Sequence, residues 1–304
     1  MKTRQFLCAV MLLLVFTAGA FAERNAAAVR VGVLRYLGTT EEAFQESIDE
    51  LNVAMRASMM GVASRNRASE TLKRLKVFVD KRYVIRFFDS LTSMLMALNA
   101  NRLDEISLPE FTARYVMKND PEYRLMFKLR MPSSIAFGFR ENSSALRDEF
   151  NTAIAGMKAD GTLEKLAEKY IGSGSDFLTE AVGFAKVDGA DTIRVAVTGD
   201  MPPVDYVNEE GMAAGYNTAV IAEIGKRLKK NIEIISIESG ARSAALTSGR
   251  ADVIFWYRTT EGLKFHEEID VDDSQMNKVL ADTTEGVILS EPYYSWENEL
   301  FLTK

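Results

Sequence analysis

Trp256, Tyr257 and Arg258 are the residues whose types and order point most directly to binding chemistry. They stand at the end of an apolar run, where a guanidinium beside two aromatic rings is a poor combination for a core, because charged side chains are almost never fully buried without a partner. Strand ends in α/β sheets also carry ligand sites. These three residues therefore indicate a site that holds an anionic group.

Groups for catalysis or for metal binding are scarce. His266 is the only histidine, which excludes a histidine cluster for zinc and any Ser/His/Asp triad that needs another imidazole. The acidic candidates show no paired spacing that would identify a general acid and a general base: Glu110, Asp200, Asp205 and Glu261. We therefore expect no enzyme activity, no metal site and no cofactor.

The N-terminus has the anatomy of a secretory signal peptide. Two basic residues precede an apolar run over 6–16, and small residues at both ends of 20–22 fit the cleavage pattern. A transmembrane helix is the alternative, but the run is short for one. We expect 1–22 to be removed, so that the mature chain begins near Glu23 in the periplasm or outside the cell. Cys8 is the only cysteine, and it is removed with this segment. We therefore expect the mature chain to have no site for lipid attachment.

The charge balance narrows the class of partner. The chain carries 37 Lys and Arg against 43 Asp and Glu, a formal net charge of −6. This acidic balance argues against nucleic acid and against an anionic membrane surface. We expect a monomer that binds a small molecule.

One eight-residue phrase occurs twice in the chain, in slightly different form. Ala-Leu-Asn-Ala-Asn-Arg-Leu-Asp at 97–104 returns as Ala-Leu-Thr-Ser-Gly-Arg-Ala-Asp at 245–252. Apolar residues at helical spacing precede each copy and a short apolar run follows it, so each copy reads as the end of a helix, a tight turn and the start of a strand. Two such units, so far apart, predict two similar α/β lobes, with a cleft between them.

Hydrophobic patterns predict further elements, and Gly-Ser-Gly-Ser at 172–175 opens the clearest linker, which extends to 191. Small hydroxyl residues before the helix that starts at Glu41 predict an N-terminal cap. The predicted strands are 29–34, 83–88, 134–139, 192–197 and 231–237, with a helix over 217–228.

Four motifs carry a resemblance to a known family. They are a strand and Pro-containing loop over 193–203, a Gly-Tyr-Asn helix start at 215–217, a Gly-Arg-x-Asp-Val turn within 248–254, and Ser-Glu-Pro-Tyr-Tyr at 290–294. Together they resemble the polar-amino-acid family of extracytoplasmic solute-binding proteins that serve ABC importers, bacterial solute-binding protein family 3. The resemblance implies a two-lobed periplasmic-binding-protein-like (type II) α/β fold, with mixed sheets flanked by helices and an interlobe cleft.

The order of the motifs is reversed relative to this family. The strand and Gly-Thr-Thr turn within 31–42 resemble the opening of the family's second lobe, and 157–166 resembles its closing helix pair. The resemblance therefore implies a circular permutation, with 23–133 as the family's second lobe and 134–304 as its first. Two tandem, partly degenerate domains are the alternative.

The family's ligand positions transfer to this sequence only in part. The carboxylate-binding Arg falls on Lys264, its assisting hydroxyl on Thr259, and the hydroxyls of the other lobe on Thr39 and Thr40. The ammonium-binding Asp falls on the uncharged Pro109. Glu110 is adjacent, and Tyr206 keeps one aromatic position of the wall. The candidate ligand-binding residues are Thr39, Thr40, Glu110, Asp200, Tyr206, Trp256, Tyr257, Arg258, Thr259 and Lys264.

Three classes of function stay open at this point. The resemblance favours a transport receptor for a small anionic or zwitterionic solute, with an ABC permease as its transient partner. A ligand sensor, or a degenerate binding module that is not coupled to transport, is the alternative, and an enzyme of the same fold is a third. Trp256 and Tyr257 have a second interpretation, in which they fill the hinge between the lobes.

Overall fold

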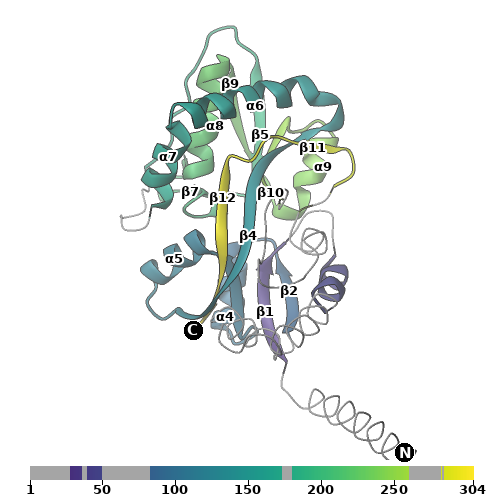
Figure 1. Cartoon of the computed structure of the whole chain (residues 1–304), viewed down its shortest axis with the longest axis vertical. Helices are drawn as coiled ribbons and strands as arrows, with labels where there is room; N and C mark the ends of the chain where they lie inside the picture. The colour runs from purple at the N-terminus through teal and green to yellow at the C-terminus, as the bar shows by residue number, and fades with distance from the viewer. Residues whose placement is uncertain (1–27, 36–39, 50–82, 173–179, 260–281, 283) are drawn as a thin grey trace, which may run out of the picture.

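A mixed β-sheet runs through the whole molecule (Figure 1). The computed structural model describes residues 28–35, 40–49, 83–172, 180–259, 282 and 284–304. Within these residues the sheet has nine strands in the order β2-β1-β3-β12-β4-β10-β5-β9, and β11 pairs with β4. Its strands are β1 (Val29–Leu34), β2 (Tyr83–Phe88), β3 (Glu105–Pro109), β4 (Arg124–Arg140), β5 (Thr192–Val197), β9 (Asn231–Ser236), β10 (Val253–Thr259), β11 (Val287–Leu289) and β12 (Tyr294–Thr303).

Helices cover this sheet, and a small second sheet lies beside it. The helices are α4 (Leu91–Asn99), α5 (Glu110–Asn119), α6 (Ser144–Ala159), α7 (Thr162–Ile171), α8 (Tyr216–Leu228) and α9 (Arg242–Thr247), with residues 41–49 also helical and 3-10 turns at η1 (Glu141–Ser143) and η2 (Ser239–Ala241). The small sheet contains β6 (Asp200–Met201), β7 (Asp205–Val207) and β8 (Ala213–Ala214). None of the helices in the described residues is long and apolar enough to cross a bilayer.

The two ends of the sheet have the same topology, which confirms the predicted pair of α/β lobes. In the N-terminal lobe β1 pairs in parallel with β2 and β3, and in the C-terminal lobe β5 pairs in parallel with β9 and β10. The strands predicted at 29–34, 83–88 and 192–197 have these bounds in the structure. Helices α4 and α9 end at the two copies of the repeated phrase, and β3 and β10 follow them.

The repeated phrase has one structural role in both lobes. Asp104 accepts hydrogen bonds from the Nε and Nη2 of Arg30 at 2.9 and 2.7 Å, and Asp252 accepts the same pair from Arg194 at 3.0 and 2.8 Å. Each aspartate therefore ties the start of one strand to the turn before the next. The turns themselves need a left-handed residue, because φ is 55° at Asn101 and 74° at Gly249.

Strands β4 and β12 connect the lobes side by side. Leu300, Phe301 and Leu302 pair with both β3 and β4, so this apolar segment is part of a central strand. Strand β12 makes this crossing as one continuous segment. The ring of Phe301 stacks on Phe127 with centroids 4.3 Å apart.

Strand β4 is longer than the predicted strand 134–139. It begins at Arg124, and its first part is mostly exposed and contains Pro132, which lacks an N–H for the ladder. The register with β12 shifts there, because Trp296 pairs with Ser133 and Asn298 with Arg130. Pro132 therefore lies in a bulge, where a strand tolerates it.

Candidate functional site

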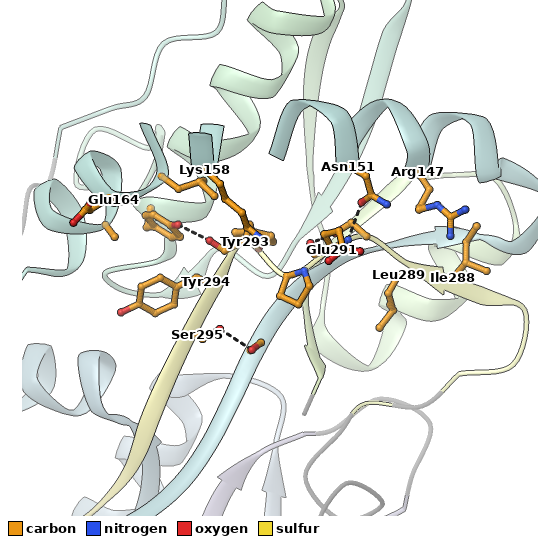
Figure 2. Close-up of a pocket in the computed structure, with 16 residues that line it drawn as sticks. Arg147, Asn151, Lys158, Glu164, Ile288, Leu289, Glu291, Tyr293, Tyr294 and Ser295 are labelled. Atoms are coloured by element: carbon orange, nitrogen blue, oxygen red, sulfur yellow. Dashed lines mark hydrogen bonds between the residues drawn. The ribbon is translucent and has the colours of Figure 1, made fainter. Parts of the chain in front are cut away.

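A large groove, called the outer groove below, lies on the C-terminal lobe. It has a volume of about 1090 Å³ and lies between α6, α7 and the segment 288–295, as Figure 2 shows. Asn151 on α6 accepts a hydrogen bond from the backbone N–H of Glu291 at 2.7 Å across it. None of the predicted site residues within the described part of the chain lines this groove.

The predicted site instead centres on a bulge in β10. The register of β10 against β4 shifts between Ile254 and Tyr257, and Trp256 has φ 57°, which is rare for a bulky residue. The guanidinium of buried Arg242 donates to the carbonyl oxygens of Phe255 and Trp256, both at 2.9 Å. A buried cation on α9 thus stabilises the bulge that directs the next side chains of β10.

Arg258 lies just beyond the bulge and is buried with a partner. Its guanidinium is 3.3 Å from the Glu299 carboxylate, and their side chains are only 8% and 4% exposed. The guanidinium also lies over the ring of Trp296, 5.3 Å from the centroid, and Trp296 Nε1 donates to Glu299 at 3.2 Å. Burial raises the pKa of Glu299, although Arg258 and the hydrogen bonds from Trp296 and Ser107 oppose the shift.

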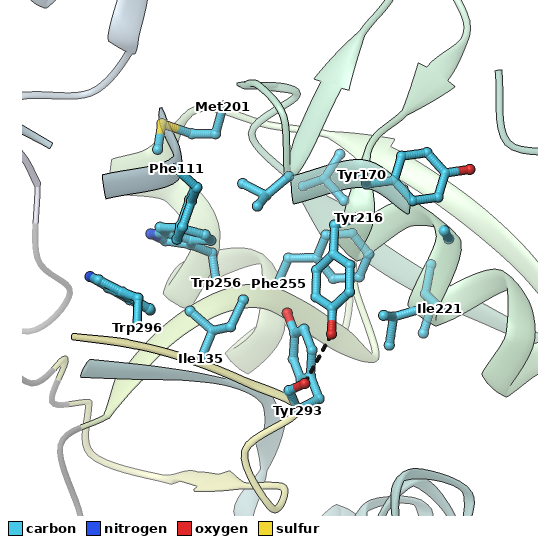
Figure 3. Close-up of a cluster of buried hydrophobic side chains, with 14 of the residues drawn as sticks. Phe111, Ile135, Tyr170, Met201, Tyr216, Ile221, Phe255, Trp256, Tyr293 and Trp296 are labelled. Atoms are coloured by element: carbon cyan, nitrogen blue, oxygen red, sulfur yellow. Dashed lines mark hydrogen bonds between the residues drawn. The ribbon is translucent and has the colours of Figure 1, made fainter. Parts of the chain in front are cut away.

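Aromatic side chains from both lobes pack around this pair. Phe111 on α5 meets Trp256, Tyr294 and Trp296 edge to face, with centroids 5.9, 5.7 and 5.6 Å apart. Trp256 and Trp296 stack at 5.8 Å, and Figure 3 shows Phe111, Trp256 and Trp296 gathered on one side of the cluster. Trp256 therefore fills the hinge, while Arg258 adds a charge to it.

A small cavity adjoins the Arg258–Glu299 pair on the N-terminal lobe. Its volume is about 40 Å³, close to that of a single water molecule in the liquid. Its described lining is mainly apolar and includes Val33, Leu34, Phe44, Pro109 and Met131. The residues with polar groups are Arg258, Glu299, Ser107 and Tyr83. A cavity of this volume is too small for an amino acid.

Glu110, which follows Pro109, turns away from this cavity. Its carboxylate takes hydrogen bonds from Arg114, Lys128 and Asn298. Burial raises the pKa of Glu110, but the bonds from Asn298 and Arg114 outweigh it and lower the pKa overall. The carboxylate of Glu110 is therefore held by Arg114, Lys128 and Asn298.

The remaining residues of β10 serve the sheet. Thr259 is buried and pairs with Ser134 across the ladder. Tyr257 is buried next to Gly138, and burial raises the pKa of its hydroxyl to about 12. These contacts give both residues a structural role next to the hinge.

Thr40 caps the helix that follows it, as predicted, because its hydroxyl accepts a hydrogen bond from the N–H of Ala43 at 3.1 Å. Thr39 and Lys264 lie outside the described residues. Asp200 and Tyr206 lie opposite each other in the small sheet, and the carboxylate of Asp200 reaches the N-terminal lobe, where it accepts a hydrogen bond from the N–H of Leu91 at 2.8 Å.

Several residues of the hinge were missed by the sequence analysis. Glu299 is the most important, since it supplies the buried acid beside Arg258. The available signal was its place directly before the apolar run 300–302, where a charge within a central strand needs a partner. Trp296, Phe111 and Arg242 carried no comparable signal.

Comparison with known proteins finds no significant match among curated sequences. Among solved structures, a ligand-binding component of an ABC-type import system from Staphylococcus aureus has 9% identity and a TM-score of 0.38, covering 90% of this chain and 65% of that one. The alkanesulfonate-binding protein SsuA from Xanthomonas axonopodis pv. citri has 10% identity and a TM-score of 0.38, covering 92% and 67%. The VFT2 domain of BvgS from Bordetella pertussis has 10% identity and a TM-score of 0.37, covering 94% and 84%. The chain thus spans about two thirds of the length of the first two.

A family model matches most of the sequence. It covers residues 26–173 and 193–261, in both lobes, and omits most of the predicted linker. This family is extracytoplasmic and its members bind solutes. The chain belongs to the bacterial extracellular solute-binding proteins, family 3.

Proposed function

We propose that this protein captures a small zwitterionic or anionic solute, an amino acid or a related molecule, at the hinge between its lobes, and delivers it to an ABC importer. The observation that carries the proposal is the buried Arg258–Glu299 pair. A guanidinium is the best protein partner for a carboxylate, and a carboxylate is a suitable partner for an ammonium.

Glu299 replaces the charge that Pro109 lacks. The two residues are directly opposite in the ladder between β12 and β3, so the carboxylate enters the site from the neighbouring strand. When a zwitterion binds, two ion pairs replace the internal pair between Arg258 and Glu299. The carboxylate of the solute then contacts Arg258 and its ammonium contacts Glu299. Lys264, Thr39 and Thr40 remain candidates for further contacts with the solute.

Entry of the solute requires the lobes to part. The cavity of about 40 Å³ beside the pair has no room for an amino acid, and α5 of one lobe packs through Phe111 against Trp256 of the other. Opening at the hinge would separate these rings and expose Arg258. Hinge closure around a ligand is a common motion of two-lobed binding proteins.

Calorimetric titration with matched probes tests the proposal. L-alanine and L-phenylalanine are compared with propionate and 3-phenylpropionate, which lack the amine. We expect the parent to bind each amino acid more tightly than the matching acid without the amine. In Glu299→Gln this ratio of affinities should fall by about tenfold or more, since hydrogen bonds to charged groups contribute about 1.5 to 3 kcal/mol. Glu291→Gln, in the outer groove, is the matched control. A preference that persists in Glu299→Gln, or the failure of all four probes to bind, contradicts the proposal.

We also propose that the chain is a circular permutant with lobes 23–133 and 134–304. The C-terminus lies at the same end of the sheet as the start of β1, and only β3 separates β12 from β1 (Figure 1). A reordered chain that begins at 192, joins 304 to 28 through a short linker and ends at 172 should fold with the circular dichroism and melting temperature of the parent. The tandem-domain account expects this reordered chain to misfold.

Export and coupling belong to the same proposal. If residues 1–22 are removed on export, intact-mass measurement of exported material should find a start near Glu23.

A sensor or an uncoupled binding module is the second candidate. The contacts between the lobes, from Phe111 to Trp256 and from Leu91 to Asp200, favour it because opening must break them. Neighbouring genes for a permease and an ATPase would support transport, whereas a neighbouring kinase gene would support sensing.

A further inference from the structure

Asp200 connects the two lobes through a single hydrogen bond at a helix terminus. It belongs to β6 of the C-terminal lobe, and its Oδ2 accepts from the N–H of Leu91, the first residue of α4 in the N-terminal lobe, at 2.8 Å. The first N–H groups of a helix lack partners within the helix and carry partial positive charge. Ser90 caps the same terminus by accepting from Ser93 N at 3.0 Å, so the hydroxyl and the carboxylate serve different N–H groups.

The C-terminal lobe holds Asp200 at the edge of a buried charge cluster. Asp205 is fully buried and accepts from the N–H of Gly199 at 3.1 Å, which shapes the turn before Asp200. The guanidinium of Arg242 interacts favourably with Asp200, Asp205 and Asp282. A favourable charge interaction therefore links Asp200 to the same arginine that stabilises the bulge before Arg258.

A second contact supports the same junction. Gly240 in η2 faces Asp89 and Arg35 of the N-terminal lobe, and a Cβ at this glycine would lie 3.6 Å from Asp89 Oδ1 and 3.9 Å from Arg35 Cδ. Arg35 and Asp89 form an ion pair with each other at 2.5 Å. Two segments of the C-terminal lobe thus meet the residues immediately before and at the start of α4.

We propose that Asp200 is an internal latch that keeps the lobes closed in the absence of a solute. Separation of the lobes must break the hydrogen bond between the N–H of Leu91 and Asp200, and it exposes the start of α4 to water. The latch opposes entry of the solute at the hinge and assists its retention after closure. This effect on binding rests on the proposed function, but closure of the free protein does not.

The test measures the conformation of the free protein. Asp200→Ala removes the acceptor, and Leu91→Pro removes the donor, since proline is tolerated as the first residue of a helix and Ser90 already has the extended conformation that proline requires of the residue before it. Glu210→Ala, an exposed acid of the same lobe, is the matched control.

We expect Asp200→Ala to speed hydrogen exchange of the Leu91 amide by about ten- to a hundredfold and to increase the radius of gyration measured by X-ray scattering. Leu91→Pro should give the same increase in radius, and the double variant should add little to either single change. Glu210→Ala should match the parent.

An unchanged radius in both single variants overturns the latch, even if the Leu91 amide exchanges faster, because the bond would then be local. Strictly additive effects in the double variant overturn it as well. Loss of near-ultraviolet circular dichroism in Asp200→Ala would indicate unfolding, and Leu91→Pro then decides alone. None of these results depends on which solute binds, so they are separate from the titrations of Glu299→Gln.

Discussion

Glu299 on β12 lies directly opposite Pro109 on β3, and its carboxylate is buried against Arg258. The acid at the hinge thus comes from the strand beside the one on which the family resemblance suggested it. Glu110, the acid adjacent to Pro109 in the sequence, binds Arg114 instead. The relationship becomes visible once the register of two strands, distant in sequence, is known.

Removal of one member of the ion pair should cost much more stability than removal of both. Arg258→Met leaves Glu299 buried without its partner, and we expect a loss of about 3 to 5 kcal/mol in the free energy of unfolding. Arg258→Met with Glu299→Leu should recover most of it. Urea unfolding of the three variants measures the coupling, and equal losses in the single and double variants would contradict a compensated buried pair.

Arg242 should be essential for the geometry of the hinge. Arg242→Met leaves the carbonyl groups of Phe255 and Trp256 without their donor, so we expect a loss of about 2 kcal/mol or more. Arg242→Lys should restore part of it, because an ammonium can donate to one carbonyl. Thermal unfolding ranks the variants, with exposed Arg250→Met as the control. Equal melting temperatures for Arg242→Met and the control would refute this role.

Protonation of Asp205 should make the protein more stable at mildly acidic pH than at neutral pH. Burial, followed by repulsion from Asp200, raises the pKa of Asp205 from 3.8 to about 6, although Arg242 and bonds from Gly199 and Thr198 oppose the shift. The folded state therefore holds a proton that the unfolded state releases between about pH 4 and 6. Protonation of Asp205 therefore raises the free energy of unfolding as the pH falls through 6, by about 3 kcal/mol at most.

Asp205→Asn keeps an oxygen for Gly199 and Thr198 but cannot ionise. The difference in the free energy of unfolding between parent and variant should change with pH in this window and level off below about pH 4. Urea unfolding at half-unit pH steps measures it. A difference that is constant from pH 7.5 to 4 would mean that Asp205 titrates normally.

Asp104 and Asp252, the aspartates of the two copies of the repeated phrase, should contribute differently to stability. Asp252 accepts from Arg140 at 3.1 Å in addition to Arg194, and its side chain is 17% exposed against 41% for Asp104. Asp252→Ala should therefore cost about 1 kcal/mol more than Asp104→Ala, the contribution of one further hydrogen bond. Chemical denaturation of the two variants compares them directly, and a larger loss for Asp104→Ala would refute the ranking.

The parts of the fold near the repeated phrase could be predicted because their signals are local. Helical spacing, a turn residue and a short apolar run lie together around both Asp104 and Asp252. The first part of β4 could not be predicted, since its exposed residues and Pro132 do not resemble a strand until β12 pairs with it. At the site, Arg258 was identified from its type and neighbours, whereas Glu299 and Arg242 depend on tertiary contacts that no window of sequence contains.

The stacked indoles of the hinge give this protein a native optical reporter. Trp256 and Trp296 are the only tryptophans in the chain, and their rings lie 5.8 Å apart at an angle of 18°. All of its indole fluorescence therefore originates at the junction of the lobes, with the guanidinium of Arg258 close enough to affect the emission of Trp296. Separation of the lobes will change this emission in real time without any attached dye, so the kinetics of opening can be recorded on the unlabelled protein.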